Sequence, residues 1–593
     1  MYQVRKIILF VLFIFFNQFV MAQPWQSQFV TINQDQTLVY HADEEGNTIP
    51  DFSMVGYASG EKEIPEVQVV EVVEAVSGDN RENIQNAIDR VATRSLGTDG
   101  FRGAVLLKKG TYNVNGSIYI EKSGIVIRGE GADESGTIIR ETAIKQLDLF
   151  CFVGSGAYER LESSKVEIDE DFVPTGRKYL LLTDATSFQV GDSVLIFRPG
   201  TDNWIHDLKM DQIEERDGTQ QWKSSGYNLY YERIITGIEG NKVTLDNPVV
   251  MQMDIKYGSG YLMKYSFDGR IRNCGIEYLL FKSTYQSDTD EDHGWNAINF
   301  SKVDQGWVQN VVSRYFGLGC VYIDFYSRNI SVLDSQCLDA KSVISGGRRY
   351  SFNCNGQLNL FKNCYATEGR HDYVTGSRVC GPNVFTQCKA IDTHADIGPH
   401  HRWASGTLYD MIDTDGQINV QDRGYLGSGH GWAGVTQVVW NCRSPETAVQ
   451  SPWVSGKNYC IGLVGGKYNG FLSDRPGGEW EGINNEGLVP ESLYEAQLKS
   501  RLLPTSTSVK MNQSSGSVKV YPNPTDGTIR IQHTEKQLTF NIYSMKGERL
   551  MTGKLFENPA IVKLGDVDNG VYLLECISKD QTYLQKIIFN RSL

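Results

Sequence analysis

Histidine and arginine are concentrated in one part of this sequence of 593 residues. The chain contains only nine histidines, and six of them fall between positions 293 and 430. The stretch GPHHRWASG, positions 398–406, places His400, His401, Arg402 and Trp403 in a row. Imidazole groups transfer protons near neutral pH, and guanidinium groups bind carboxylates through paired hydrogen bonds. This stretch therefore predicts a site that performs acid–base chemistry on an anionic substrate.

Residues of the same kinds surround this stretch. Catalytic roles are predicted for His400, His401, Arg402, His371, Arg348 and Tyr350, and substrate contacts for Arg349, Arg370, Tyr373, Arg378, Trp403, His430, Trp432 and His293. The aromatic members are expected to be exposed and to present flat faces to sugar rings. In an extended segment alternate side chains point to opposite sides, so His400 and Arg402 are expected to face the substrate, and His401 and Trp403 to face away.

These residue types suit β-elimination next to a uronic acid. Removal of the proton α to the carboxylate builds an enolate-like dianion, which requires positive charge at the carboxylate, a base at that carbon and an acid for the leaving oxygen. Arginine supplies the charge, histidine the base, and tyrosine or histidine the acid. The predicted substrate is an acidic polysaccharide or oligosaccharide, such as pectin, alginate, glucuronan or ulvan.

Other interpretations of the same residues remain open. Hydrolysis would use paired carboxylates, for which Asp392, Asp396, Asp410, Asp413 and Asp415 are candidates. Loss of water from a sugar end would use the same elimination chemistry, and a non-catalytic carbohydrate-binding protein would use the same groove. The arginines and histidines could also form a structural ion-pair network with Asp372, Asp392, Asp396 and Asp410.

One acidic segment raises the question of a metal. DTDEDH, positions 288–293, holds five ionisable groups besides one threonine. It lacks the glycine and the distal glutamate of an EF-hand, so a solvated acidic loop is expected and Ca²⁺ is the alternative. No Cys/His pairs have the spacing of zinc ligands. No cofactor is predicted with certainty.

A repeat of amide and small residues organises the middle of the chain. The stretches Asn273-Cys274, Asn310-Val311, Gln336-Cys337, Asn363-Cys364, Gln387-Cys388 and Asn441-Cys442 align, with Ile418 filling the position before the last. From Val311 to Cys388 the steps are 26, 27 and 24 residues. This period is typical of one coil of a parallel β-helix, whose equivalent residues stack about 4.8 Å apart. The cysteines are therefore predicted to be buried thiols in the interior, not disulfides.

The start of the chain carries a family resemblance. Residues 79–93 predict an amphipathic helix with Ile84, Ala87, Ile88 and Val91 on its apolar face, followed by strands over 103–131. This order resembles the N-terminal cap and first coils of the pectate-lyase superfamily, over roughly residues 65–470. The resemblance implies an all-β, right-handed parallel β-helix of the polysaccharide-lyase kind over 23–502. Residues 155–265 interrupt the repeat as a β-rich insertion, whose Trp204, His206, Trp222 and Tyr227 either pack locally or reach the groove.

The two ends of the chain predict export. Residues 1–22 combine a short basic start, an apolar run and Ala22 at a cleavage site, which is typical of a signal peptide. Residues 503–518 have the composition of a linker. The small β-domain over 519–593 resembles the C-terminal sorting domain of the Bacteroidetes type IX secretion system. This resemblance rests on Pro522-Asn523-Pro524, Gly527, Asn569-Gly570-Val571-Tyr572 and Lys586.

The net charge and the length of the apolar runs limit the classes of partner. The formal net charge is −14 with no basic tract, which disfavours nucleic acid. After the signal peptide no apolar run is long enough for a transmembrane anchor. The expected partners are the acidic carbohydrate and the type IX machinery, and the protein is expected to be a secreted or cell-surface monomer.

Overall fold

The computed structural model of the protein describes residues 23–503, 518–523, 525–533, 537–544, 549–565, 567–577 and 582–589. The chain divides into two compact units after Arg501, and each is described separately. The predicted signal peptide at 1–22, most of the predicted linker and Pro524 lie outside the described residues. Among the described residues, no helix is both long and apolar enough to cross a bilayer.

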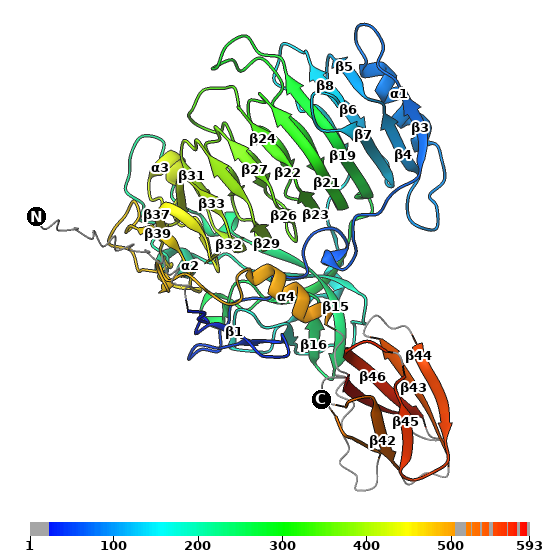
Figure 1. Ribbon diagram of the computed structural model, residues 1–593. Helices are drawn as coiled ribbons and strands as arrows, with labels where there is room; N and C mark the ends of the chain where they lie inside the picture. Colours follow the sequence, from blue (N-terminus) through cyan, green and yellow to red (C-terminus); the bar gives the residue numbers. More distant parts are fainter. Residues whose placement is uncertain are drawn as a thin grey trace, which may run out of the picture. The chain divides into compact units, whose positions relative to one another are not determined.

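Strands of the first unit stack coil upon coil into three parallel sheets (Figure 1). The first sheet contains β3 (Val69–Val73), β4 (Gly103–Leu107), β7 (Ile125–Gly131), β19 (Ile271–Ser283), β21 (Val303–Arg314), β23 (Arg328–Leu333), β26 (Leu360–Lys362), β29 (Cys380–Thr386), β32 (Ala404–Asp410), β36 (Val438–Trp440), β38 (Tyr459–Ile461) and β40 (Glu479–Glu481). The second contains β5 (Gly110–Val114), β8 (Thr137–Glu141), the second halves of β19 and β21, β24 (Gln336–Leu338), β27 (Tyr365–Thr367), β30 (Lys389–Ile391), β33 (Asp413–Thr414), β37 (Arg443–Val449) and β39 (Val464–Lys467). The third contains β6 (Ile118–Ile120), β9 (Phe150–Val153), β20 (Asn296–Ser301), β22 (Gly319–Ile323), β25 (Phe352–Cys354), β28 (Tyr373–Thr375), β31 (Asp396–Pro399) and β34 (Gln417–Val420). The predicted parallel β-helix is confirmed.

The corner between the first and second sheets explains the sequence repeat. Asn310, Asp334, Asn363, Gln387, Met411 and Asn441 each precede this corner with φ between 49° and 55°. Short polar side chains tolerate this left-handed conformation because they can form hydrogen bonds locally. The next residue in each coil points into the interior, where Val311, Cys364, Cys388, Ile412 and Cys442 are buried. The repeated motif is therefore a backbone requirement followed by a small apolar residue.

Strand register corrects the predicted alignment at three positions. Tyr365 pairs with Gln336, so Ser335 and not Cys337 is equivalent to Cys364. Cys274 pairs with Gly306 and belongs to a different corner. Ile418 lies in the third sheet, and Ile412 fills the missing position. Cysteine fills several interior positions of the coil, so residue type alone could not distinguish the corners.

The interior of the coils is continuous and apolar. Stacked rings run along it, with centroid distances of 4.6 Å between Phe361 and Phe385 and 5.5 Å between Phe385 and Tyr409. All eleven cysteines are buried and free, which confirms the prediction of interior thiols. Helix α1 (Arg81–Ala92) lies at the blue end of the coils in Figure 1 and contacts β3, β4 and β6. The predicted apolar residues Ile84, Ala87, Ile88 and Val91 are buried.

A β-rich insertion separates β9 from β19. One antiparallel sheet contains β10 (Glu159–Arg160), β11 (Val166–Glu167), β13 (Tyr179–Leu181), β14 (Ser193–Arg198), β15 (Leu229–Glu239), β16 (Lys242–Leu245) and β18 (Tyr261–Ser266). A smaller one pairs β12 (Phe172–Val173) with β17 (Met253–Asp254). Helix α2 (Asp202–Asp207) follows β14, and helix α4 (Leu493–Leu502) ends the unit. Trp204, Trp222 and Tyr227 are buried in the core that the insertion shares with the coils, so they pack there and do not line a groove.

The second unit consists of two antiparallel sheets around its own apolar core. One contains β41 (Lys519–Tyr521), β42 (Thr528–Gln532) and β45 (Ala560–Lys563). The other contains β43 (Leu538–Ser544), β44 (Arg549–Leu555), β46 (Gly570–Ile577) and β47 (Thr582–Phe589). Alternate residues face inward, as in Thr528–Gln532, where Ile529 and Ile531 are buried. The predicted small β-domain is confirmed.

The left-handed corner can be tested at Asn363, an exposed residue whose backbone φ is 54°. Both Asn363→Val and Asn363→Gly remove its hydrogen bond to Asp334, but only valine strains the backbone. We expect the valine variant to be less stable than the glycine variant by about 1–2 kcal/mol. Urea unfolding followed by tryptophan fluorescence measures the difference. Equal stabilities of the two variants would contradict the corner geometry.

Candidate functional site

Four histidine side chains meet beside the third sheet. His371 precedes β28, His400 and His401 follow β31, and His430 follows the turn α3 (Leu426–Gly429). Ring centroids are separated by 4.4 Å for His371–His400, 5.1 Å for His400–His401, 5.1 Å for His400–His430 and 4.9 Å for His401–His430. We call these residues the histidine cluster. Residues from three successive coils are thus in direct contact.

Tyr350 completes one edge of the histidine cluster. Its ring lies 4.9 Å from that of His371 and 5.5 Å from that of His400. The phenol oxygen lies 3.1 Å from Nε2 of His400, which is hydrogen-bonding distance. A phenol and an imidazole in this contact can pass a proton between them.

His371 is held in one tautomer. Its Nδ1 lies 2.8 Å from the carbonyl oxygen of Asp396 and 3.4 Å from the Asp396 carboxylate. A carbonyl oxygen only accepts, so Nδ1 carries the proton and Nε2 is unprotonated in the neutral ring. Nε2 is buried and has no hydrogen-bond partner among the described residues. His371 thus contributes an unused proton acceptor to the interior of the cluster.

His400 and His401 both contact His430, and the chain bends at His401 and Arg402. Arg402 has φ of 53° and Trp403 has φ of 70°, between the end of β31 and the start of β32. The expectation that His400 and His401 point in opposite directions assumed an extended segment and is wrong. Trp403 anchors this bend, because its ring is fully buried against Trp204 of the insertion, 5.0 Å away.

Burial and neighbouring cations keep the cluster neutral. Desolvation lowers the pKa of His400 to about 2, of His401 to about 4 and of His430 to about 3, and lowers that of His371 well below its usual value. The positive charges of Arg402 and Arg378 lower the pKa of His401 further, and that of Arg370 acts on the other three. All four rings are therefore uncharged proton acceptors at neutral pH.

Three guanidinium groups around the cluster have no acidic partner in the described part of the chain. Arg402 donates to the carbonyl and hydroxyl of Ser428 at 3.0 and 2.7 Å. Arg378 donates to the Gly226 carbonyl at 2.7 Å, and Arg370 to the Gly346 carbonyl. Each therefore lies near neutral histidines without an internal counter-charge. Their remaining N–H groups match the geometry of a bound carboxylate.

Two other predicted arginines are already paired. Arg348 forms a bidentate ion pair with Glu291 at 2.7 and 2.9 Å. Arg349 is buried and donates to the Ser342 carbonyl, with Glu368 at 3.6 Å. Arg349 therefore has a structural role instead of the predicted substrate contact. Arg348 is occupied by Glu291 in this structure.

Burial overturns the predicted aromatic platform. Tyr373, Trp403 and Trp432 each have an exposed fraction of 0%. Tyr373 points into the coil interior and stacks on Phe352, while Trp432 packs in the core shared with the insertion. The prediction treated these residues as exposed, but a long inward side chain and an insertion core both hide them from a ligand.

The acidic loop and His293 lie apart from the cluster. His293 is fully buried between the Ser283 hydroxyl and the Lys341 carbonyl, so its predicted substrate contact is wrong. Glu291 pairs with Arg348, and Asp288 pairs with Lys341 at 3.0 Å. Across the described ranges, no three His, Cys, Asp or Glu side chains are arranged to hold a metal ion. Asp290 accepts hydrogen bonds from the backbone N–H groups of Gln286 and Asp292.

The carboxylates considered for hydrolysis are dispersed. Asp410 is buried and accepts hydrogen bonds from Thr386, Ser492 and the first backbone N–H of α4. Asp413 pairs with Lys389 at 2.8 Å. Asp392 and Asp415 contact each other through a backbone N–H at 2.7 Å. Only Asp396 reaches the cluster, where it also pairs with Arg423, so these residues form neither a hydrolytic pair nor one ion-pair network.

Arg423 is a site residue that sequence reasoning missed. It is buried, pairs with Asp396, and its charge lowers the pKa of His371 and His430. It follows Arg402 by 21 residues, close to one coil. This spacing of about one coil could have identified Arg423 from the sequence.

The Asp396–Arg423 pair gives a stability prediction. Asp396→Asn leaves the Arg423 guanidinium, only 8% exposed, without a counter-charge. We expect a loss of about 3 kcal/mol in the free energy of unfolding, and substantial recovery in the double variant Asp396→Asn/Arg423→Met. Thermal unfolding compares the three proteins. A single variant as stable as the parent would contradict the importance of this pair.

The lowered pKa values predict acid sensitivity. The unfolded chain protonates histidine near pH 6.5, whereas the folded cluster resists protonation until about pH 2 to 4. The unfolded state therefore binds more protons as pH falls below 6.5, and stability is lost through that window. We expect His401→Gln/His430→Gln to show a smaller loss between pH 6.5 and 4.5. His394→Gln, which alters a histidine bonded to Glu368, is the control and should match the parent.

Comparisons with known proteins give one domain assignment. Residues 519–590 match the family model described as the secretion system C-terminal sorting domain. The chain has no match among curated proteins.

Several solved structures resemble the chain at low identity. The tailspike protein gp49 of Pseudomonas phage LKA1 is 16% identical over 65% of this chain and 62% of its own, with a TM-score of 0.33. An alginate lyase from Paenibacillus sp. str. FPU-7 is 8% identical over 70% and 99%, with a TM-score of 0.34. DFA-IIIase from Arthrobacter chlorophenolicus A6 is 10% identical over 73% and 88%, with a TM-score of 0.27. The fold rests on the strand pairing above, and not on these likenesses. The chain is thus a parallel β-helix protein with a secretion system C-terminal sorting domain, exported by type IX secretion to the cell surface or beyond.

Proposed function

We propose that the protein is a polysaccharide lyase that cleaves an acidic polysaccharide or oligosaccharide by β-elimination at a uronic acid. The carrying observation is a neutral histidine cluster under the positive charge of three arginines, Arg370, Arg378 and Arg402, that have no acidic partner among the described residues. Arginines that lack an internal counter-charge favour a bound anion. Neutral imidazoles beside them supply proton acceptors at working pH.

Arg370 and Arg402 are proposed to hold the uronate carboxylate. Their guanidinium groups stabilise the negative charge that grows on the carboxylate as the adjacent proton leaves. The bound carboxylate also adds negative charge beside the histidines, which raises their pKa from the low values of the free protein. Substrate binding would therefore strengthen the base it requires.

His401 is the proposed base and Tyr350 the proposed acid. His401 is half-buried and neutral, and it takes the C5 proton of the uronate. The C5–H electron pair forms the C4–C5 double bond, the C4–O bond breaks, and the leaving oxygen takes a proton from Tyr350. Burial raises the pKa of Tyr350, so its phenol is protonated at neutral pH, and His400 at 3.1 Å stabilises the phenolate as it forms.

The reaction can be followed by the ultraviolet absorbance of an unsaturated uronate. The secreted protein is mixed with polygalacturonate, alginate, glucuronan and ulvan, and with their oligosaccharides. We expect absorbance to rise with at least one substrate, and product masses to show chain cleavage. Masses reduced only by one water would indicate a dehydratase. New reducing ends without absorbance would contradict elimination and favour hydrolysis.

Three variants test the proposed roles on whichever substrate responds. We expect Tyr350→Phe and His401→Gln each to lower kcat by roughly 10²–10⁴-fold, because each removes a proton-transfer group. Arg402→Gln should raise KM and also lower kcat, because it removes a charge that binds the carboxylate and stabilises its growing negative charge. His394→Gln is the matched control, because His394 bonds to Glu368 and not to the cluster, and its kinetics should match the parent. Full activity in folded Tyr350→Phe and His401→Gln would remove the cluster from the reaction.

A further inference from the structure

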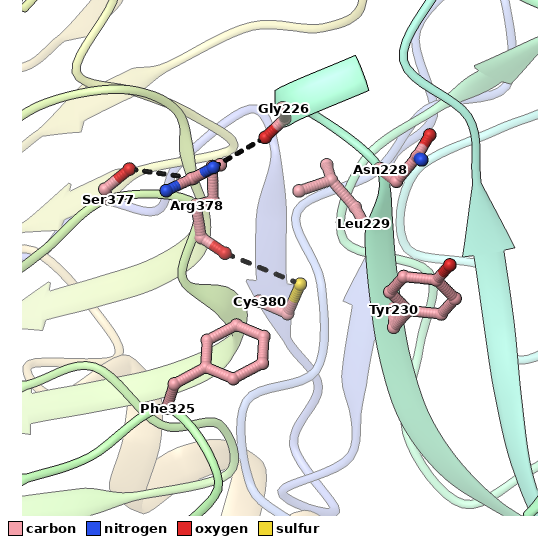
Figure 2. Close-up of a pocket in the computed structure, with 8 residues that line it drawn as sticks. All are labelled: Gly226, Asn228, Leu229, Tyr230, Phe325, Ser377, Arg378 and Cys380. Atoms are coloured by element: carbon pink, nitrogen blue, oxygen red, sulfur yellow. Dashed lines mark hydrogen bonds between the residues drawn. The ribbon is translucent and has the colours of Figure 1, made fainter. Parts of the chain in front are cut away.

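A pocket of about 270 Å³ lies where the insertion meets the coils (Figure 2). Strand β15 and the turn before it supply one wall, and the loops after β22 and β28 supply the other. Its lining includes Asn228, Leu229, Tyr230, Phe325, Ser377 and Arg378. Pockets that mix apolar faces with a few fixed polar groups are typical of ligand sites. None of the catalytic roles proposed above uses this space.

Arg378 gives the pocket a positive charge with a fixed position. Its Nη1 donates to the Gly226 carbonyl at 2.7 Å and its Nε to the Ser377 hydroxyl at 3.0 Å, as Figure 2 shows. No carboxylate pairs with it in the described part of the chain, and the residue is exposed. Nearby, the side-chain oxygen of Asn228 accepts a hydrogen bond from the Gly200 backbone N–H at 3.0 Å. That bond does not use the side-chain N–H groups of Asn228. The polar groups of the pocket are thus hydrogen-bond donors, which suit an anionic, hydroxyl-rich ligand.

Two aromatic rings supply the apolar faces. Phe325 is 37% exposed, and Tyr230 is partly exposed with its hydroxyl held by Arg160 at 2.8 Å. Figure 2 shows the two rings on opposite sides of the space next to Cys380. An exposed phenylalanine in a concave site gains free energy when a flat apolar face covers it. The less polar face of a sugar ring has that shape.

The pocket continues the line of the histidine cluster. The Arg378 backbone N–H donates to the Arg402 carbonyl at 2.8 Å, so the two loops belong to adjacent coils. Phe325 follows β22, and β22, β25, β28 and β31 pair in succession. Phe325 is therefore three coils from His400, or about 14 Å at the spacing between paired strands. That distance exceeds one sugar ring, so only an oligosaccharide could occupy both places.

We infer that this pocket is a second binding site for a uronate residue of the same carbohydrate chain, away from the bond that is cleaved. Arg378 binds its carboxylate, and Phe325 and Tyr230 contact the ring. The inference rests on the proposed function, and it adds a direction: the chain runs along the β-helix axis, from the histidine cluster toward the coil of β22. It makes the protein selective for longer chains over short ones.

The test compares substrates of increasing length in Phe325→Ala and in a matched control. In the parent protein kcat/KM should rise with oligosaccharide length. Phe325→Ala should lose about tenfold for the polymer and progressively less for shorter substrates, since a well-packed contact is worth about that factor. Phe556→Ala removes a ring that is 67% exposed in the second unit and should retain the parental length dependence. An unchanged length dependence in Phe325→Ala would overturn the proposal that the pocket binds a second uronate, and would leave the lyase proposal intact.

Binding without turnover separates the two proposals. Electrophoresis through gels containing each acidic polysaccharide measures retention of the full chain directly. Arg378→Ala should weaken retention, whereas Arg94→Ala, which removes an exposed arginine bonded to the Arg102 carbonyl, should not. Retention that depends on Arg378 and Phe325, in a protein with no turnover, would support the pocket and reject the lyase. If no polysaccharide of the panel retained the parent protein, the proposal that the pocket binds a uronate would be overturned.

Discussion

Hydrogen bonding between coils fixes the distance between equivalent side chains, and the site depends on this constraint. Each parallel strand pairs with the next in register, so the loops that follow successive strands are held about one strand spacing apart. Arg378 and Arg402, which follow the paired strands β28 and β31, are held in this way, and the Arg378 backbone N–H donates to the Arg402 carbonyl at 2.8 Å. Where a carboxylate is available, as for Arg348 and Arg423, the structure neutralises the charge internally. Arg370, Arg378 and Arg402 lack such a partner and retain a positive charge that a ligand can use.

The insertion converts a regular coil into a shaped site. It buries Trp403 and Trp432, which would otherwise lie on the surface of the coils. Burying Trp403 holds the left-handed bend that follows His400 and His401. The same insertion supplies Gly226 for Arg378 and the wall of the neighbouring pocket. Trp403 and Trp432 were predicted to contact sugar rings. Their role in this structure is to position the side chains of the proposed site.

The repeat in the sequence predicted the coils of the β-helix. It did not predict which residues occupy which corner of a coil. Spacing near 25 residues predicted the β-helix, and the concentration of histidine predicted the cluster. Residue type could not show that Cys337 and Cys364 occupy different positions, because both are buried in the same interior. Alternation of side chains failed at His400 and His401, because the chain bends at His401 and Arg402 and continues with positive φ at Arg402 and Trp403. The burial of Tyr373 and His293 depends on contacts between residues far apart in the sequence, which residue type alone does not reveal. The pairing of Arg423 with Asp396 of the adjacent coil likewise depends on strand register.

The central claim is that unpartnered arginines hold a uronate carboxylate beside a neutral histidine. A crystal structure of the Tyr350→Phe variant with a uronate oligosaccharide would test it most directly, because loss of the acid should preserve the bound substrate. The account predicts a carboxylate between the Arg370 and Arg402 guanidinium groups, with C5 of that sugar facing His401. An oligosaccharide bound on another face, or bound here with its carboxylate away from both arginines, would contradict it.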